Sequence, residues 1–149
     1  MEISFQADVS VRSVISDIDG TGLQVGEPER AESSSVGTLT DLGGGVYRIT
    51  YTESTEGGEV NTTLEIEGEG LTLRREGALS SHMRFREGEE YKTLYSVPPY
   101  SFDMIILPRR VDISASRARI DIRLVYDMTV GGVARRVNMR ASAVSRGLN

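Results

Sequence analysis

The sequence predicts an all-β protein, folded as a single closed up-and-down antiparallel β-barrel of about 8 to 10 strands over residues 1–149. Apolar and polar residues alternate with a period of two along most of the chain, and no stretch of about 12 residues shows a helical repeat. Glycine and proline turn signals recur at short intervals, as they do between the strands of hairpins. Closing such a meander removes the exposed strand edges that promote aggregation, so a barrel is favoured over an open sheet.

The first third of the chain holds three expected strands and one long irregular segment. Residues 3–15 alternate in polarity and form the first strand. Residues 16–30 are polar and interrupted by three glycines and Pro28, which predicts the longest loop of the protein. Two further strands are expected at 32–39 and 46–54, joined by a turn that contains three consecutive glycines.

The remaining chain reads as a series of hairpins. Short turns at Gly57-Gly58, Pro98-Pro99, Pro108-Arg109 and Gly131-Gly132 interrupt the alternation. Between these and similar turns, strands are expected at 60–67, 71–76, 80–86, 91–97, 101–107, 111–115, 119–128 and 133–144. Neighbouring segments of this set are also compatible with being two bent halves of one strand.

Composition excludes several classes of site. The chain has no cysteine and one histidine, His82, so it has neither a disulfide framework nor the ligands of a cysteine or multi-histidine metal site. Asp17-Ile18-Asp19-Gly20 begins like a calcium loop, but Pro28 stands where the closing glutamate is needed. We therefore expect no metal and no cofactor. No run of about 18 apolar residues is present, so no membrane span is expected.

Charge is divided unevenly along the chain. Residues 1–70 hold 14 Asp and Glu against 3 Lys and Arg, a net charge of −11, whereas residues 71–149 hold 8 against 14, a net charge of +6. In a barrel this asymmetry places acidic strands beside basic ones. The sequence pI of about 5.0 and the lack of clustered lysines argue against a nucleic-acid partner. Residues 1–5 lack the basic start and apolar core of a signal peptide, which predicts a cytoplasmic location.

Several motifs resemble one known family. They are Val11-Arg12-Ser13-Val14-Ile15 before an Asp-Gly turn, Gly70-Leu71-Thr72-Leu73-Arg74-Arg75-Glu76-Gly77-Ala78, Met83-Arg84-Phe85-Arg86-Glu87-Gly88 and Leu124-Val125-Tyr126-Asp127-Met128. Taken together they resemble the bacterial YwiB-like, or DUF1934, family over nearly the whole chain. The resemblance implies a fold similar to the calycins, which include lipocalin-like and fatty-acid-binding barrels, and it implies no particular activity. Two features depart from the family pattern: Pro98-Pro99-Tyr100-Ser101 replaces a tight Pro-Tyr-Gly turn, and the segment Ser16 to Ser34 is longer and more acidic.

One arginine falls on the row that should fill the barrel. Leu71, Leu73 and Arg75 share one face of their strand, so the Arg75 guanidinium is directed toward the core. A buried guanidinium needs a carboxylate, a hydroxyl network, water or a ligand anion, and fatty-acid-binding barrels use interior arginines for carboxylates. Alternatively, Arg75 lies at the barrel mouth beside the Gly77 turn and extends to solvent.

Tyrosines supply most of the aromatic bulk, because the chain has three phenylalanines and no tryptophan. Tyr47 and Tyr51 flank Ile49 on one face, and Tyr126 shares its face with neighbouring apolar residues. Together with Tyr95 these rings are expected either to line a cavity or to complete a filled core.

A basic row is expected on the outside. His82 shares its face with Arg84 and Arg86, opposite Met83 and Phe85, and Lys92 follows on the next strand. This row is either an ordinary solvated face or a surface that contacts an anion. No G-x-S-x-G elbow surrounds Ser80 and Ser81, and no orienting acid can be identified, so no catalytic residue is assigned.

These observations favour a non-enzymatic binding protein whose barrel takes a small amphiphilic or anionic ligand. Arg75 would be its polar anchor, with Tyr47, Tyr51, Tyr95 and Tyr126 along the wall. The alternative is a filled barrel that acts as a protein-interaction module through its outer surface, using the His82, Arg84, Arg86 and Lys92 row or the acidic segment 17–32. A barrel of this size is just wide enough for either arrangement.

Overall fold

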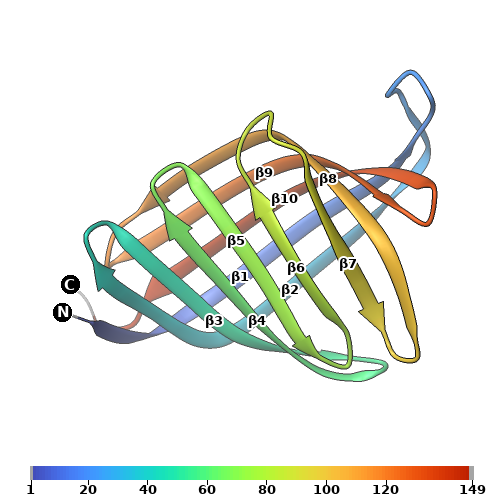
Figure 1. Cartoon of the computed structure of the whole chain (residues 1–149). Coiled ribbons are helices and arrows are strands. Elements are labelled where there is room, and N and C mark those ends of the chain that lie inside the picture. The colour runs from blue at the N-terminus through green and yellow to red at the C-terminus, as the bar shows by residue number, and fades with distance from the viewer. Residues whose placement is uncertain (1, 148–149) are drawn as a thin grey trace.

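A computed structural model describes residues 2–147 and confirms the all-β, single-barrel fold (Figure 1). Ten antiparallel strands close a barrel in the order β1-β10-β9-β8-β7-β6-β5-β4-β3-β2. The strands are β1 (Ile3–Ile18), β2 (Gln24–Gly43), β3 (Val46–Thr55), β4 (Gly58–Glu67), β5 (Gly70–Gly77), β6 (Ser80–Phe85), β7 (Tyr91–Val97), β8 (Tyr100–Ala115), β9 (Arg119–Val130) and β10 (Val133–Ser145).

The expected alternation places the core inside the barrel. In β9, Ile120, Ile122, Leu124 and Tyr126 are buried, and the residues between them face outward. The same pattern repeats around the barrel, where the largest side chains with less than 2 % of their surface exposed are Phe85, Leu39, Ile49, Leu64, Ile66, Leu71, Met104, Ile106, Ile120 and Leu124. Most of the interior is therefore filled by side chains.

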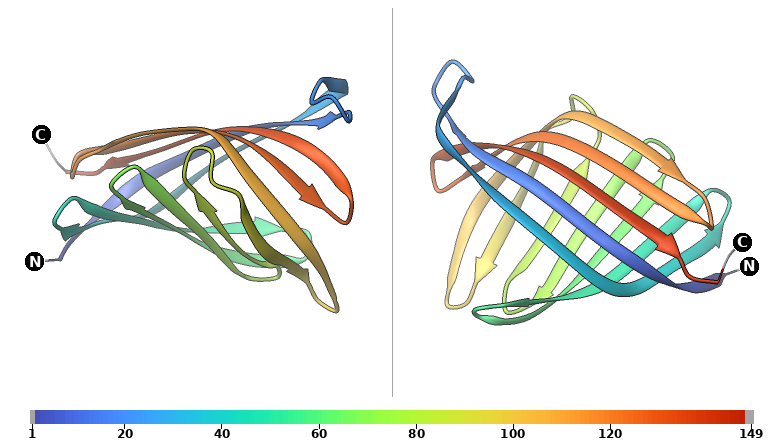
Figure 2. Two further views of the ribbon diagram at one scale, coloured as in Figure 1. Left: turned by 45° about the horizontal axis from the view of Figure 1, so that its top comes forward. Right: turned by 180° about the vertical axis from the view of Figure 1, so that it is seen from behind.

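The prediction of a long loop at residues 16–30 is wrong. β1 continues to Ile18 and β2 already begins at Gln24, so the two strands form one long hairpin whose tip projects beyond the β9–β10 hairpin (Figure 2). Pairing passes from Ile15↔Glu29 to Asp17↔Val25, and this register shift accommodates Pro28 and Gly26, which has a positive φ of 74°. The polar composition reflects the first part of β2, which is exposed on both faces, rather than an irregular chain.

The turn predicted at Pro108-Arg109 is also wrong, and the alternative of two bent halves of one strand is confirmed, because segments 101–107 and 111–115 are two parts of β8. The register against β9 shifts between Pro108 and Arg110. A proline is tolerated here because the pairing of β7 with β8 ends at Ile106, so Pro108 needs no amide hydrogen on that side.

The barrel has one weakly paired seam. β6 and β7 pair only through Ser80↔Ser96 and Ser81↔Tyr95, and the second half of β8 has no strand beside it on the β7 side. The β6–β7 turn covers part of this edge: the Gly88 amide donates to the Pro108 carbonyl at 2.9 Å, and the Glu87 carboxylate accepts from the Val111 amide at 2.9 Å. Side-chain and turn contacts thus replace part of a β ladder.

The two ends of the barrel differ. The hairpins β1–β2, β3–β4, β5–β6, β7–β8 and β9–β10 meet at one end, whereas both chain termini lie at the other (Figures 1 and 2). Hereafter the end opposite the chain termini is called the mouth. Within residues 2–147 there is no helix of the length and apolarity needed to cross a membrane.

Candidate functional site

A row of polar and aromatic side chains crosses five adjacent strands near the mouth. The register joins Tyr51 to Thr62, Thr62 to Arg75, Arg75 to Ser81, and Ser81 to Tyr95. Directly paired residues share a face of the sheet, and this face is the interior, since Thr62 and Ser81 are 1 % and 5 % exposed. The β ladder therefore brings Arg75 together with two hydroxyls and two tyrosines. We call these five residues the mouth row.

Arg75 is held between the core and the mouth. Its guanidinium lies 3.9 Å from the Glu53 carboxylate, and the side chains of Arg75 and Glu53 are 28 % and 21 % exposed. Both sequence interpretations of Arg75 are therefore partly realised, because the residue faces inward and also reaches the open end. At 3.9 Å the contact with Glu53 is an ion pair without hydrogen-bond geometry.

Three buried polar atoms of the mouth row have no hydrogen-bond partner among the described residues. They are the Thr62 hydroxyl, the Arg75 Nε and the Ser81 hydroxyl, which belong to neighbouring strands β4, β5 and β6. A buried polar group without a partner costs about 1–3 kcal/mol, more when the group is charged. Three adjacent donors of this kind form a concentrated site for an acceptor such as a carboxylate.

The tyrosines near Arg75 stay neutral at ordinary pH. Burial, followed by the negative charge of Glu53, raises the pKa of Tyr51 well above its usual range, while the Arg75 charge acts in the opposite direction. Burial raises the pKa of Tyr126 to about 12, again opposed by Arg75. The Tyr126 ring also packs against Phe85 with a centroid separation of 4.8 Å. Both hydroxyls therefore keep their protons.

The structure separates one predicted residue from the others. Tyr47 is half-buried and pairs with Ile66, four residues along β3 from Tyr51 and away from the mouth. Tyr95 lies within the mouth row, and Tyr126 approaches Arg75 from β9. Glu53 was not identified from the sequence, although it continues the alternation of Tyr47, Ile49 and Tyr51.

The outer basic row does not form one continuous ladder. His82, Arg84, Arg86 and Lys92 are all exposed, which agrees with the expected solvent-facing side of β6. However, β6 and β7 are not paired at these positions, and His82 Nδ1 instead lies 2.8 Å from the Tyr91 hydroxyl. His82 also lines a small pocket of about 200 Å³, whereas Arg86 belongs to a different and larger cleft.

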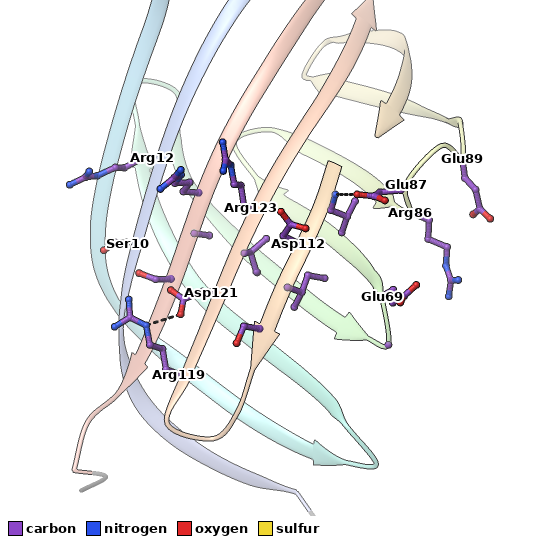
Figure 3. Close-up of a pocket in the computed structure, with 18 residues that line it drawn as sticks. Ser10, Arg12, Glu69, Arg86, Glu87, Glu89, Asp112, Arg119, Asp121 and Arg123 are labelled. Carbon is purple, nitrogen blue, oxygen red and sulfur yellow. Dashed lines mark hydrogen bonds and ion pairs between the residues drawn. The ribbon is translucent and has the colours of Figure 1, made fainter. Parts of the chain in front are cut away.

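That larger cleft, of about 1000 Å³, lies on the outside of the barrel (Figure 3). Its residues come from β1, β8, β9 and β10 and from the β4–β5 and β6–β7 turns. The five arginines that line it are Arg12, Arg86, Arg119, Arg123 and Arg140. Arg12, Arg123 and Arg140 were not singled out from the sequence, because only the register shows which outward residues become neighbours.

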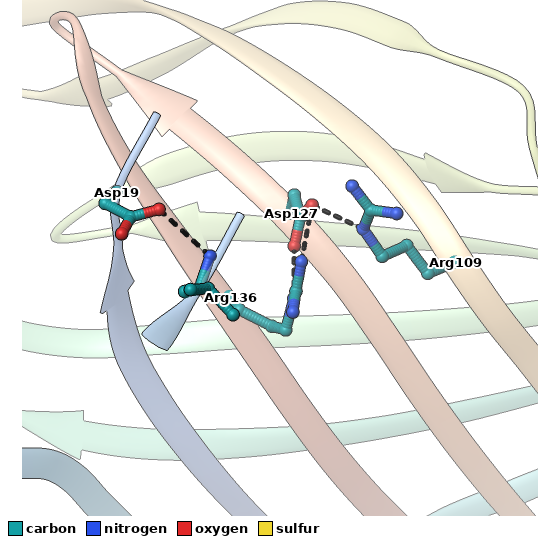
Figure 4. A network of polar contacts seen from close by, with 5 residues as sticks. Asp19, Arg109, Asp127 and Arg136 are labelled. Atoms are coloured by element: carbon teal, nitrogen blue, oxygen red, sulfur yellow. Dashed lines mark hydrogen bonds and ion pairs between the residues drawn. The ribbon is translucent and has the colours of Figure 1, made fainter. Parts of the chain in front are cut away.

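A second outer cluster is an ion-pair network with an evident structural role. Arg109 and Arg136 approach the Asp127 carboxylate from opposite sides, with Arg136 Nε at 2.8 Å (Figure 4). Burial alone would raise the pKa of Asp127, but hydrogen bonds from the two guanidinium groups outweigh burial and lower it. Two guanidinium groups share one carboxylate, so the network ties β8, β9 and β10 together and retains a net positive charge.

Comparison with known proteins supports the fold. The chain is similar to a solved structure described as "Crystal structure of ywiB protein from Bacillus subtilis", with 20% sequence identity, coverage of 95% of this chain and 92% of that chain, and a TM-score of 0.82. At this identity the likeness establishes the fold alone. No curated protein matches the sequence significantly. The family described as "Domain of unknown function (DUF1934)" matches residues 11–138, which is most of the chain. The alternating strands, the ten-stranded barrel and this match agree, and the chain belongs to the DUF1934 family.

Proposed function

We propose that this protein binds a small carboxylate-bearing ligand at the mouth of its barrel, with Arg75 as the anchor. The observation that carries the proposal is the set of three buried, unpartnered polar atoms of Thr62, Arg75 and Ser81 on adjacent strands. Carboxylate oxygens accept hydrogen bonds from guanidinium and hydroxyl groups at once, which would satisfy all three.

The packing of the barrel limits the size of the ligand. The core below the mouth row is closed by side chains such as Ile49, Leu64 and Leu73, each no more than 2 % exposed. A long acyl chain therefore has no room in the interior, in contrast to fatty-acid-binding barrels. Only the acidic group enters the mouth.

The rim of the mouth suits an amphiphilic ligand. On the β7–β8 hairpin, Val97, Tyr100 and Phe102 are 38 %, 65 % and 42 % exposed. Phe102 is paired with Tyr95 and so continues the mouth row toward solvent. An apolar tail that follows a carboxylate would lie against these side chains. Each Å² of apolar surface buried in this contact contributes about 25 cal/mol of favourable transfer free energy.

Glu53 is the internal competitor of such a ligand. Its carboxylate contacts Arg75 at 3.9 Å and would repel a second carboxylate placed beside the same guanidinium. Replacing Glu53 by glutamine removes the repulsion and preserves the shape of the side chain.

Isothermal titration calorimetry with octanoate and with octanol tests the proposal. Arg75→Leu is expected to weaken octanoate binding at least about tenfold, since a hydrogen bond to a charged group contributes about 1.5–3 kcal/mol. Glu53→Gln is expected to strengthen it about twofold to fivefold. Octanol should bind weakly and equally to all forms, because it carries no charge.

The matched control is Arg84→Leu, the same change at an exposed arginine on the outer face of β6. It should leave octanoate affinity unchanged, and melting temperatures measured in parallel separate loss of binding from loss of fold. Equal octanoate affinity in the wild type and Arg75→Leu would overturn the proposal.

A second candidate function is favoured by the closed interior. A barrel whose core is filled can act through its outer surface, where His82, Arg84, Arg86 and Lys92 are exposed. The double variant Arg84→Glu/Arg86→Glu distinguishes the two functions when the octanoate titration is combined with pull-down of a cellular partner. It leaves octanoate binding intact if the mouth is the site, and it removes attraction between this face and an acidic protein partner if the outer surface is the site.

A further inference from the structure

Three arginines stand side by side on the outside of the barrel. Arg12 of β1 is paired with Arg140 of β10, and Arg140 is paired with Arg123 of β9. The same row ends at Glu32 of β2 and at Asp112 of β8. Side chains of directly paired residues lie about 5 Å apart at Cβ, and like charges placed in this way destabilise a sheet. We call Arg12, Arg140 and Arg123 the arginine row.

The acids at the two ends do not neutralise the row. Glu32 forms an ion pair with Arg12 at 2.6 Å, and Asp112 is bound by Arg110 from its own strand. Within residues 2–147, Arg123 and Arg140 form no ion pair. The Arg123 Nε is moreover buried without a hydrogen-bond partner. Two adjacent guanidinium groups thus lack an anion.

The row lines the large outer cleft rather than a flat surface. Arg12, Arg123 and Arg140 all contribute to the cleft of about 1000 Å³, and the labelled Arg12 of β1 and Arg123 of β9 lie on either side of β10 in Figure 3. Two hydroxyls adjoin them, because Ser10 and Ser142 are paired one row away and line the same cleft. The wall therefore offers guanidinium and hydroxyl donors together.

We propose that this cleft binds a compact phosphate-bearing ligand through the arginine row. A phosphate group carries up to two negative charges and at least three acceptor oxygens, so it can accept from more than one guanidinium and from a serine at the same time. Its binding removes the repulsion between Arg123 and Arg140 and satisfies the buried Arg123 Nε. This site is separate from the mouth, since the mouth row faces the interior of the barrel and the arginine row faces outward.

Charge around the cleft favours a small ligand over a polymer. Five carboxylates line the same cleft: Glu69, Glu87 and Glu89 in the turns, and Asp112 and Asp121 on the wall of the arginine row, where Arg110 and Arg119 bind them. These groups would repel the successive phosphates of a nucleic acid, whereas a single phosphate or diphosphate seated between Arg123 and Arg140 meets fewer of them. The overall charge of −5 acts in the same direction.

Calorimetric titration with inorganic phosphate, pyrophosphate and glycerol 3-phosphate at low ionic strength tests the site. The wild type is expected to bind at least one probe, and Arg140→Gln to bind it about tenfold more weakly. Arg123→Gln/Arg140→Gln should abolish the binding. Stronger binding of glycerol 3-phosphate than of inorganic phosphate identifies a phosphate ester as the ligand class, and the reverse identifies free phosphate.

Arg48→Gln is the matched control, because it removes one positive charge from β3, away from the cleft. It should leave phosphate binding unchanged, and so should Arg75→Leu, which separates this site from the mouth. A second readout is thermal unfolding, in which phosphate raises the melting temperature of the wild type and not that of the double variant. The proposal would be overturned if no probe bound at about 10 mM, a concentration high enough to detect a site with a millimolar dissociation constant. Equal binding of a probe by the wild type and the double variant would also overturn it.

Discussion

At the scale of single residues, the period-two alternation predicts which side chains face inward but not which ones meet. Arg75, Tyr51 and Tyr126 were placed on the interior face from their own strands, and all three are found there. Glu53 follows the same parity on β3 and was missed, because its contact with Arg75 crosses from β3 over β4 to β5. Contacts of this kind depend on register, which a single sequence specifies only weakly.

Burial of two tyrosines predicts a loss of stability in alkali. In the unfolded chain a tyrosine ionises near pH 10, whereas in the folded protein Tyr126 has a pKa of about 12 and the pKa of Tyr51 is raised as well. Between these values the unfolded state binds fewer protons than the folded state, so stability falls as pH rises. It is fully present below about pH 10 and decreases above it by up to about 1.4 kcal/mol per pH unit for each tyrosine.

Urea unfolding at pH values from about 8 to about 11.5, a range that includes the tyrosine pKa of the unfolded chain, measures this slope. Tyr126→Phe removes one of the two groups and should make the slope shallower. Tyr100→Phe is the control, because Tyr100 is 65 % exposed on the rim and should not change the slope. An identical slope in the wild type and Tyr126→Phe would refute the assignment.

At the scale of strands, the sequence correctly predicts the strands that have one buried face. It misreads strand segments that are exposed on both faces. The strand expected at 60–67 agrees closely with β4, where Val60, Thr62, Leu64 and Ile66 are buried in alternation. The first half of β2 is exposed on both faces, so no alternation marks it as a strand, and Gly26 and Pro28 suggested a loop. It is a strand because β1 supplies its hydrogen bonds over a long ladder.

Close contact between β2 and β3 predicts a sensitive glycine. A Cβ at Gly37 would lie 2.2 Å from the Thr50 carbonyl oxygen and 3.0 Å from the Tyr51 Cβ, so the two strands would have to separate. Gly37→Ala is expected to destabilise the fold by about 1–3 kcal/mol, the usual effect of overpacking.

Gly20 at the tip of the β1–β2 hairpin is the control for Gly37. A Cβ there would have no atom within 4 Å, and its φ is not positive, so Gly20→Ala should change the free energy of unfolding by less than about 0.5 kcal/mol. Chemical denaturation of the two variants compares them directly, and equal stability would show that β2 and β3 are not closely packed at Gly37.

At the scale of the whole molecule, barrel closure explains the division of charge along the chain. The first and last strands are neighbours, and ion pairs join the acidic first half to the basic second half: Asp8 with Arg146 at 2.7 Å, Asp17 with Arg135 at 3.2 Å, and Asp41 with Arg117 at 2.6 Å. Exposed pairs of this kind each contribute about 0–1 kcal/mol, so they favour correct closure more than they stabilise the core. The sequence predicted this arrangement because the uneven charge is visible without any register.

The meander of β3 to β7 brings the mouth row together, and the main proposal is that this row holds a carboxylate. Native mass spectrometry of the protein, purified gently from its expression host and compared with Arg75→Leu prepared in parallel, tests the claim most directly. If Arg75 anchors a carboxylate, a small acidic molecule is bound at one copy per chain in the wild type and absent from Arg75→Leu, with organic extraction giving its identity. An unliganded mass for the wild type that persists after addition of a panel of small carboxylates would contradict it.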